Sequence, residues 1–446
     1  MGQSISPSDR MAGPNGRLAR MQQASLVAEP AGARAFGESL DALAARPDQA
    51  VSLGIRMPFC VTHCLCCERN IQAAQPADSI ADYLGAIAEQ SRAIAARVGM
   101  GRDVLHLHLG GGSMDELQGP PIAWLMDALR SAWRLPADAR LSADCDPRRC
   151  GWVQLKQLAS LGFRRVNFGV FDLDPAVQAA IGRFQSPALT EDVCNLARDC
   201  GFDCITLDLM IGLPQQNLAG WRQTLDRVVA IAPDRITLRR YRHQPWRAPG
   251  QCAIDGDDLP DAETCRALAE QASATLRSAG YRWVGDDQFV LDTDELAQAF
   301  DQGRLHRGLD GYAVLPSSPL IGLGVDALSD IDGDLYWAES SLPTWRAQVR
   351  AGYFPVARVC TADTTEAQRR RVVSALRCQL AWPATEATNG LASAYRQLAA
   401  READGLVEVH GDRIVLTEAG RHVLPALCED LGIATLPPTG ATCAAS

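Results

Sequence analysis

Lysine is nearly missing from this chain. Lys156 is the only lysine among 43 basic residues, so almost every positive charge belongs to an arginine. The 53 acidic residues outnumber the basic ones and give a formal net charge of −10, without a long basic run. This balance argues against general nucleic-acid binding, which depends on an excess of positive charge. The arginine excess fits a GC-rich coding bias, and it also fits recognition of carboxylates or phosphates by the forked guanidinium.

Long apolar segments are missing as well. The sequence contains no stretch of about 18 uninterrupted apolar residues, so we expect no membrane span. The first residues, MGQSISPSDRMAGPNGRLAR, lack the apolar core of a secretory signal. We therefore expect a cytoplasmic, reducing environment, in which the 15 cysteines do not form a disulfide framework.

Strand-like and helix-like segments alternate between residues 51 and 241. Apolar runs predict strands at 51–57, 104–110, 139–145, 164–170, 204–210 and 235–241. Helices are predicted between them at about 79–98, 120–133, 152–161, 174–200 in two pieces, and 218–232. This alternation indicates βαβ units and an α/β fold with a parallel sheet. The pattern is compatible with a curved, incomplete barrel and with a doubly wound sheet. In either fold, ligands gather at the carboxyl ends of the strands.

The composition divides the chain into five segments. Residues 1–34 read as a loose polar leader, 35–245 as the partial barrel, 246–360 as a barrel extension, 361–435 as a C-terminal domain and 436–446 as a tail. The sequence of the C-terminal domain predicts helices at about 365–379, 389–403 and 418–431 together with a β-hairpin, which is a winged-helix-like pattern. Because the chain as a whole is acidic, we expect the domain to pack on the barrel rather than to bind DNA.

One cluster of cysteines stands out. Cys60, Cys64, Cys66 and Cys67 lie within eight residues. A zinc site usually takes two separated ligand pairs, and no second pair follows at a suitable spacing. Disulfides are disfavoured by the expected compartment. An iron–sulfur cluster fits best, because Cys60, Cys64 and Cys67 form C-x3-C-x2-C and supply three thiolates to a four-iron cube with one iron left open.

Further motifs carry a resemblance to a known family. Leu109-Gly110-Gly111-Gly112-Ser113 ends the second strand, and together with the cysteines it resembles the radical S-adenosylmethionine (SAM) superfamily. The words MPFC, HLHLGGGS, DCDPR, LGFRRVNFGV, DLMIGLP, LHRGLDGY and IGLGVDALS extend the resemblance to oxygen-independent coproporphyrinogen III oxidases, over about residues 36–430.

The resemblance implies a fold, cofactors and a reaction. The fold would be a partial parallel (β/α)6 barrel with a mostly helical, winged-helix-like C-terminal domain. A [4Fe–4S] cluster on Cys60, Cys64 and Cys67 and one or two molecules of SAM would convert two propionates of coproporphyrinogen III to vinyls. The product would be protoporphyrinogen IX, made for haem without oxygen. An electron donor is then required, and we expect a monomer. Residues matching the family's SAM pockets are Gly111, Gly112, Ser113, Asp144, Phe171, Arg183, Asp208, Arg242 and Leu328.

The chain also departs from the family's pattern. Where the family has Tyr, His, an aromatic residue, Cys, Glu and Gln, this chain has Gly54, Arg56, Cys66, Arg69, Asp144 and Phe171. Two alternatives therefore stay open: a paralogue that binds the cluster with SAM or haem but does not decarboxylate, and a radical SAM enzyme with another substrate. For coproporphyrinogen III we expect weaker turnover than in relatives with the Tyr and Gln. Candidates to meet the substrate's carboxylates at the barrel mouth are Arg165, Arg240, Arg242 and Arg307.

Overall fold

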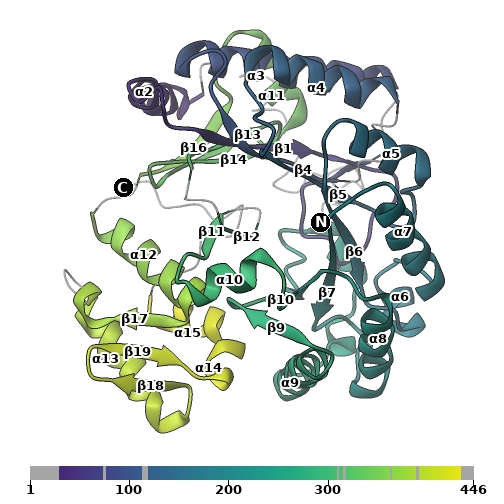
Figure 1. Cartoon of the computed structure of the whole chain (residues 1–446), viewed down its shortest axis with the longest axis vertical. Coiled ribbons are helices and arrows are strands. Elements are labelled where there is room, and N and C mark those ends of the chain that lie inside the picture. Colours follow the sequence, from purple (N-terminus) through teal and green to yellow (C-terminus); the bar gives the residue numbers. More distant parts are fainter. Residues whose placement is uncertain are drawn as a thin grey trace, which may run out of the picture.

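The computed structural model describes residues 30–73, 77–112, 119–308, 311–314, 318–361, 364–387 and 391–432. Its centre is a twelve-stranded sheet within those residues (Figure 1). Six neighbouring parallel strands form the middle of the sheet, each within one residue of its predicted bounds. They are β1 (Val51–Met57), β4 (Val104–Gly111), β5 (Arg140–Cys145), β6 (Arg165–Phe171), β7 (Cys204–Ile211) and β8 (Arg235–Arg240).

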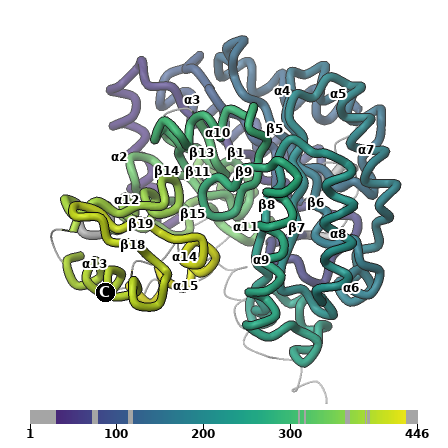
Figure 2. The backbone as a smooth tube through the Cα atoms, turned by 60° about the horizontal axis from the view of Figure 1, so that its bottom comes forward, coloured from purple at the N-terminus to yellow at the C-terminus, as the bar shows by residue number. Residues whose placement is uncertain are grey.

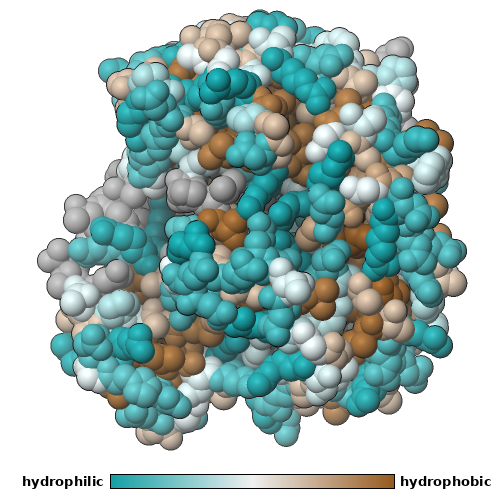
Figure 3. Space-filling model, in the orientation of Figure 1, coloured by the Kyte–Doolittle hydropathy of each residue, from teal (hydrophilic) through white to brown (hydrophobic). Residues whose placement is uncertain are grey.

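Helices connect these strands and cover the outer face of the sheet (Figure 1). They are α3 (Ala77–Val98), α4 (Pro120–Ala132), α5 (Trp152–Ser160), α6 (Pro175–Ala180), α7 (Pro187–Asp199) and α8 (Leu218–Ile231). The segment predicted as two helical pieces is divided after Gly182, which has φ +64°, and Ser186 caps the second piece. Apolar side chains of the helices and the sheet form the main core, and hydrophilic residues cover most of the face shown in Figure 3.

The strand order decides between the two folds that the sequence left open. The six parallel strands follow one another in chain order, β1-β4-β5-β6-β7-β8, without the reversal that defines a doubly wound sheet. The predicted partial barrel is therefore confirmed. The ring stays open among the described residues, because β9 (Tyr281–Val284) and β16 (Val356–Cys360) end the sheet and do not pair.

The barrel extension adds strands at both sides of the six. On one side β10 (Gln288–Leu291) pairs with β8, and β9 with β10, both antiparallel. On the other side β13 (Leu320–Leu323) pairs in parallel with β1, which the sequence did not predict. Antiparallel β14 (Leu328–Ile331), β15 (Asp334–Ala338) and β16 follow. The remaining elements here are α2 (Ala33–Ala44), α9 (Ala262–Ser278), α10 (Glu295–Asp301), β11 (His306–Gly308), β12 (Gly311–Ala313) and α11 (Leu342–Arg350).

The residues from 364 to 432, called here the C-terminal module, lie beside the open side of the barrel (Figure 2). They form α12 (Thr364–Gln379), β17 (Ala381–Pro383), α13 (Ala392–Ala400), β18 (Val407–His410), β19 (Arg413–Leu416), α14 (Glu418–His422) and α15 (Leu424–Asp430). The module has an apolar cluster of its own, centred on Trp382 and Leu398.

The predicted hairpin is confirmed, and the structure differs from the C-terminal prediction in two details. Strand β17 pairs with β19, so the hairpin is part of a three-stranded sheet. The single helix predicted at 418–431 is two helices, and Pro425 stands in the first turn of the second one, where its missing N–H costs no helical hydrogen bond. The predicted domain boundaries stay a prediction. None of the described helices combines the length and apolarity that a membrane crossing requires.

Candidate active site

The cysteine loop lies over the carboxyl ends of the parallel strands. Short strands β2 (Phe59–Cys60) and β3 (Gln72–Ala73) pair in parallel and bring the two ends of the loop together. The loop borders a cavity of about 660 Å³, whose other walls include residues of β4, β5, β6 and β7 and the segment 247–250. Polar residues at those strand ends therefore face the cysteines, as expected for parallel α/β sheets.

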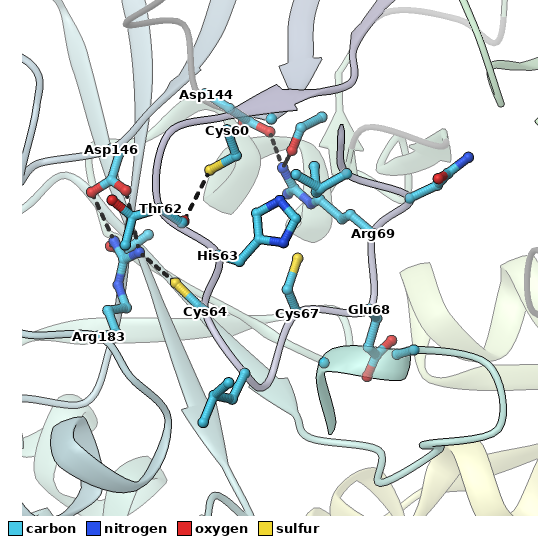
Figure 4. A pocket seen from close by; sticks show the side chains of 18 of the residues that line it. Cys60, Thr62, His63, Cys64, Cys67, Glu68, Arg69, Asp144, Asp146 and Arg183 are labelled. Carbon is cyan, nitrogen blue, oxygen red and sulfur yellow. Dashed lines mark hydrogen bonds and ion pairs between the residues drawn. The ribbon is translucent and has the colours of Figure 1, made fainter. Parts of the chain in front are cut away.

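Three of the four clustered cysteines line this cavity, and we call Cys60, Cys64 and Cys67 the cysteine triad. Figure 4 shows the Cys67 sulfur directed into the space that the loop surrounds, whereas the Cys64 sulfur points toward Arg183. Burial raises the pKa of the Cys60 thiol and of the Cys67 thiol.

The fourth cysteine points elsewhere. Cys66 is 1% exposed and packs in an apolar cluster with Val177, Ile181 and Leu213. Burial raises the pKa of its thiol, so it stays protonated. Cys66 is thus a packing residue under the loop, whereas its three neighbours face the cavity.

The donor arrangement differs from that of a site for one metal ion. Among the described residues, no group of three or more His, Cys, Asp or Glu converges as a single ion requires. A four-iron cube binds each thiolate through a different iron, so three thiols spread around a cavity suit it better than three thiols that meet at one point.

A buried charged cluster lies on one side of the triad. Arg183 is 4% exposed and donates to Asp146 at 3.2 Å, to the Gly169 carbonyl, and to Cys64 Sγ at 3.4 Å. Arg148 binds the same carboxylate at 2.6 Å and reaches Cys64 Sγ at 3.5 Å. Burial acts to raise the pKa of Asp146, but the two guanidinium groups outweigh it and lower that pKa. Two arginines thus donate hydrogen bonds to the Cys64 sulfur.

Sequence reasoning missed two members of this cluster. Asp146 and Arg148 belong to the DCDPR word that follows β5, directly after a predicted strand end. Charged residues at such a position are candidates for a site, and that signal was available in the sequence. Only the structure shows that their partner is Arg183, 37 residues away from Asp146.

A second ion pair lies on another side of the triad (Figure 4). Arg69 donates to Asp144 at 3.2 Å and also to the Gly111 carbonyl. Asn167 donates to the other oxygen of Asp144 at 3.1 Å. Burial acts to raise the pKa of Asp144, but His108 and Arg69 outweigh it and hold that pKa well below its usual range. Arg69, which stands where the family has a cysteine, is therefore bonded to the acid that stands where the family has a glutamate.

The glycine run is constrained by the chain itself. Gly111 has φ +108°, and a Cβ on Gly112 would lie 1.9 Å from the Phe59 carbonyl oxygen. Gly112 also donates its N–H to the Met57 carbonyl. The sequence-based reason for these glycines was close approach to a ligand. The structure adds another, since the strand end must pass against the backbone that leads into the cysteine loop.

Phe171 and Asp208 complete the cavity wall. Phe171 has φ +70°, which is unusual for a bulky residue, and the Arg183 guanidinium lies 4.8 Å from the centre of its ring. Asp208 is 7% exposed and accepts from Arg239 at 3.1 Å, so the buried carboxylate expected in this strand has an arginine partner.

Some predicted site residues lie outside this cavity. Arg242 is exposed and lines a neighbouring cavity, and Leu328 lines a third one. Ser113 lies outside the described residues.

The expectation that four arginines share the barrel mouth was wrong for Arg165. Arg165 stands at the start of β6, the opposite end of the barrel, paired with Glu295 at 2.6 Å. Arg307 lines the neighbouring cavities but binds Asp286 at 2.7 Å and Asp287 at 2.8 Å, so its charge is already neutralised.

Comparisons with known proteins agree with this geometry. The chain is 33% identical over 389 residues to the oxygen-independent coproporphyrinogen III oxidase of Pseudomonas aeruginosa, covering 85% of this chain and 84% of that protein. The enzyme of the same name from Escherichia coli is 33% identical over 404 residues, 88% of each chain. This chain belongs to the oxygen-independent coproporphyrinogen III oxidase family. Residues 55–228 match the radical SAM superfamily.

A solved structure supports this family assignment. Coproporphyrinogen III oxidase (HemN) from Escherichia coli, a radical SAM enzyme, superposes with a TM-score of 0.83 at 30% identity, covering 88% of this chain and 92% of that one. The likeness extends through the C-terminal module, because the match covers far more than the barrel alone. The departures at Gly54, Arg69 and Phe171 therefore occur within a conserved overall fold.

Proposed function

We propose that this chain is an oxygen-independent coproporphyrinogen III oxidase, which converts two propionates of coproporphyrinogen III to vinyl groups with release of CO2. The observation that carries the proposal is the cysteine triad, which lines a cavity at the carboxyl ends of the parallel strands. The family membership supplies the substrate. This function places the protein in anaerobic haem biosynthesis, and we propose that it acts as a cytoplasmic monomer supplied by a separate electron donor.

The residues around the cavity fit the cofactors of a radical SAM enzyme. Cys60, Cys64 and Cys67 would hold a [4Fe–4S] cluster and leave one iron for the amino and carboxylate groups of SAM. When bound, this pair supplies a one-electron cleavage of SAM that ends in hydrogen abstraction from the substrate. Gly111, Gly112, Asp144, Phe171, Arg183 and Asp208 line the same cavity and are the candidates to contact SAM.

The chain's own groups have distinct tasks in this proposal. Arg148 and Arg183 donate hydrogen bonds to the Cys64 sulfur and so position it, and Asp146 fixes both arginines in place. The Arg183 Nε is buried and has no hydrogen-bond partner among the described residues, so one donor of that guanidinium stays available for a ligand carboxylate. Asp208 offers a carboxylate oxygen to ribose hydroxyls on the opposite wall.

The test is an anaerobic reconstitution with iron and sulfide, followed by reduction in the presence of SAM. We expect formation of 5′-deoxyadenosine, and release of CO2 when coproporphyrinogen III is added. Deoxyadenosine without CO2 would indicate a different substrate. The absence of both products from a fully loaded protein would indicate a cluster-binding scaffold.

A cysteine series tests the cluster assignment separately. Replacing any member of the cysteine triad by alanine should abolish the four-iron cluster, as measured by iron content and by electron paramagnetic resonance. Cys66→Ala is the matched control, since Cys66 is a thiol of the same loop that packs away from the cavity. A full cluster in the Cys64→Ala protein would contradict the assignment.

A further inference from the structure

A second cavity, called here the arginine cavity, adjoins the candidate active site. It measures about 610 Å³ and lies between strands β7, β8 and β9 and the two last helices of the C-terminal module. Figure 2 shows α14 beside α9 at this contact. Five residues line both cavities, so a molecule in the arginine cavity would adjoin the cysteine triad; they are Cys67, Glu68, Arg69, Phe171 and Asp208.

The arginine cavity is positive within an acidic chain. Seven arginines and five carboxylates line it, whereas the whole chain has a net charge of −10. Four of the seven arginines bind carboxylates. The other three, Arg240, Arg242 and Arg421, form no ion pair with any residue that the structure describes. The lining thus holds two more arginines than carboxylates, and this local excess of positive charge favours an anionic ligand.

Arg421 is the most unusual of the three. Its guanidinium lies 3.9 Å from the centre of the Trp283 ring, and its Nε donates to the Gly285 carbonyl. Its Nη2 is buried without a hydrogen-bond partner among the described residues. A buried charged donor without an acceptor is costly, and an incoming carboxylate would satisfy it. Arg240, whose Nη2 donates to the His422 carbonyl at 2.6 Å, keeps further N–H groups for the same purpose.

Apolar side chains form another part of the cavity wall. Met210, Leu238, Trp283, Val423 and Pro425 contribute to it. Apolar surface together with arginines suits a ligand that combines a large apolar body with carboxylates. SAM also carries a carboxylate, but it offers a smaller apolar body than a tetrapyrrole does.

We propose that the C-terminal module completes the substrate site, with Arg421 and Arg240 binding propionate carboxylates of the porphyrinogen while its ring system lies on the apolar wall. This inference rests on the proposed function. It assigns the module a direct role in recognition, because Arg421 comes from α14 and Arg240 from the last residue of β8. The substrate would then bridge the module and the barrel.

The test compares Arg421→Gln and Arg240→Gln with the native holoenzyme. We expect the KM for coproporphyrinogen III to rise about tenfold to a hundredfold, with kcat changed by less than about threefold and the KM for SAM unchanged; a tenfold change corresponds to about 1.4 kcal/mol. Arg421→Lys, which keeps the charge, should recover part of the loss. Arg277→Gln is the matched control, because Arg277 pairs with Glu418 across the same contact and does not line the cavity.

Each contrary result has a definite meaning. If the native enzyme turns over coproporphyrinogen III and both Gln variants keep its KM, the inference is wrong while the proposed function stands. A rise in the KM for SAM alone would assign the carboxylate to SAM and overturn the substrate assignment. Thermal unfolding and iron content identify any variant that fails to fold.

A binding measurement separates this inference from the proposed function. If the native enzyme releases no CO2, coproporphyrin III and its tetramethyl ester are titrated against the reconstituted protein by fluorescence. Binding that requires both the free carboxylates and Arg421 supports the cavity as a tetrapyrrole carboxylate site. Equal binding of acid and ester, or equal binding to the native and Arg421→Gln proteins, overturns it.

Discussion

The substitution Gly112→Ala tests how the glycine run acts. A Cβ there would lie 1.9 Å from the Phe59 oxygen and 2.7 Å from its carbonyl carbon, so the two segments must separate by more than about 1 Å to reach ordinary contact. Phe59 is fully buried and packs edge-on against Tyr83 at 5.2 Å, so it has little freedom to move away. The displacement would pass directly to Cys60, the next residue of the chain.

We expect this strain to lower both stability and cluster content. Overpacking of this kind costs about 1–3 kcal/mol, which urea unfolding of the cluster-free protein would measure. Iron bound after reconstitution should fall in parallel. Gly85→Ala is the control, because Gly85 lies within α3 with no atom close to its missing Cβ, and alanine there should raise stability by about 0.5–1 kcal/mol.

Two outcomes would refute this reasoning. Native stability and native iron content in the Gly112→Ala protein would show that the backbone contact does not constrain this position. If stability and iron are native but SAM no longer changes the spectrum of the reduced cluster, the glycine acts at the ligand and not through the chain.

Three further predictions follow from the same geometry. The double change Gly54→Tyr and Phe171→Gln should raise CO2 release, because the two new side chains restore polar groups that the family has at these positions. A Cβ at Gly54 meets only Leu320 Cδ1, at 3.6 Å, so the backbone has room for a side chain there. An unchanged rate would show that these departures are neutral. His422 has a pKa lowered by burial and by Arg240, so the unfolded chain takes up this proton more readily; stability should fall as the pH drops below about 6.5, and His422→Gln should flatten that slope in urea unfolding. Asp286→Asn should lower the free energy of unfolding by about 3–5 kcal/mol, because this buried carboxylate binds both Arg307 and Arg377 at 2.7 Å across the contact between the barrel and the module. A module that resists proteolysis as well as in the native protein would contradict this prediction.

Much of the fold could be predicted because it depends on local patterns. Apolar runs set the six parallel strands, and turn and cap residues such as Ser186 set the limits of the helices between them. Strand β17 escaped prediction because three residues carry too little periodicity. The parallel pairing of β13 with β1 escaped it because Ser52 and Leu320 meet only when the sheet curves around.

The candidate site, like the fold, could be predicted from the sequence only in part. The spacing of Cys60, Cys64 and Cys67 and the glycine run were evident from the sequence, since a ligand loop keeps its spacing within one short segment. Only the tertiary structure turned Cys66 into the apolar cluster under the loop, placed Arg165 at the opposite end of the barrel, and joined Arg183 to Asp146. Side-chain direction and pairing between distant segments depend on how the strands are arranged around the barrel, and no local pattern encodes that arrangement. The arginine cavity is of this second kind, because Arg240 and Arg421 come from distant elements that meet only when the C-terminal module packs on the barrel.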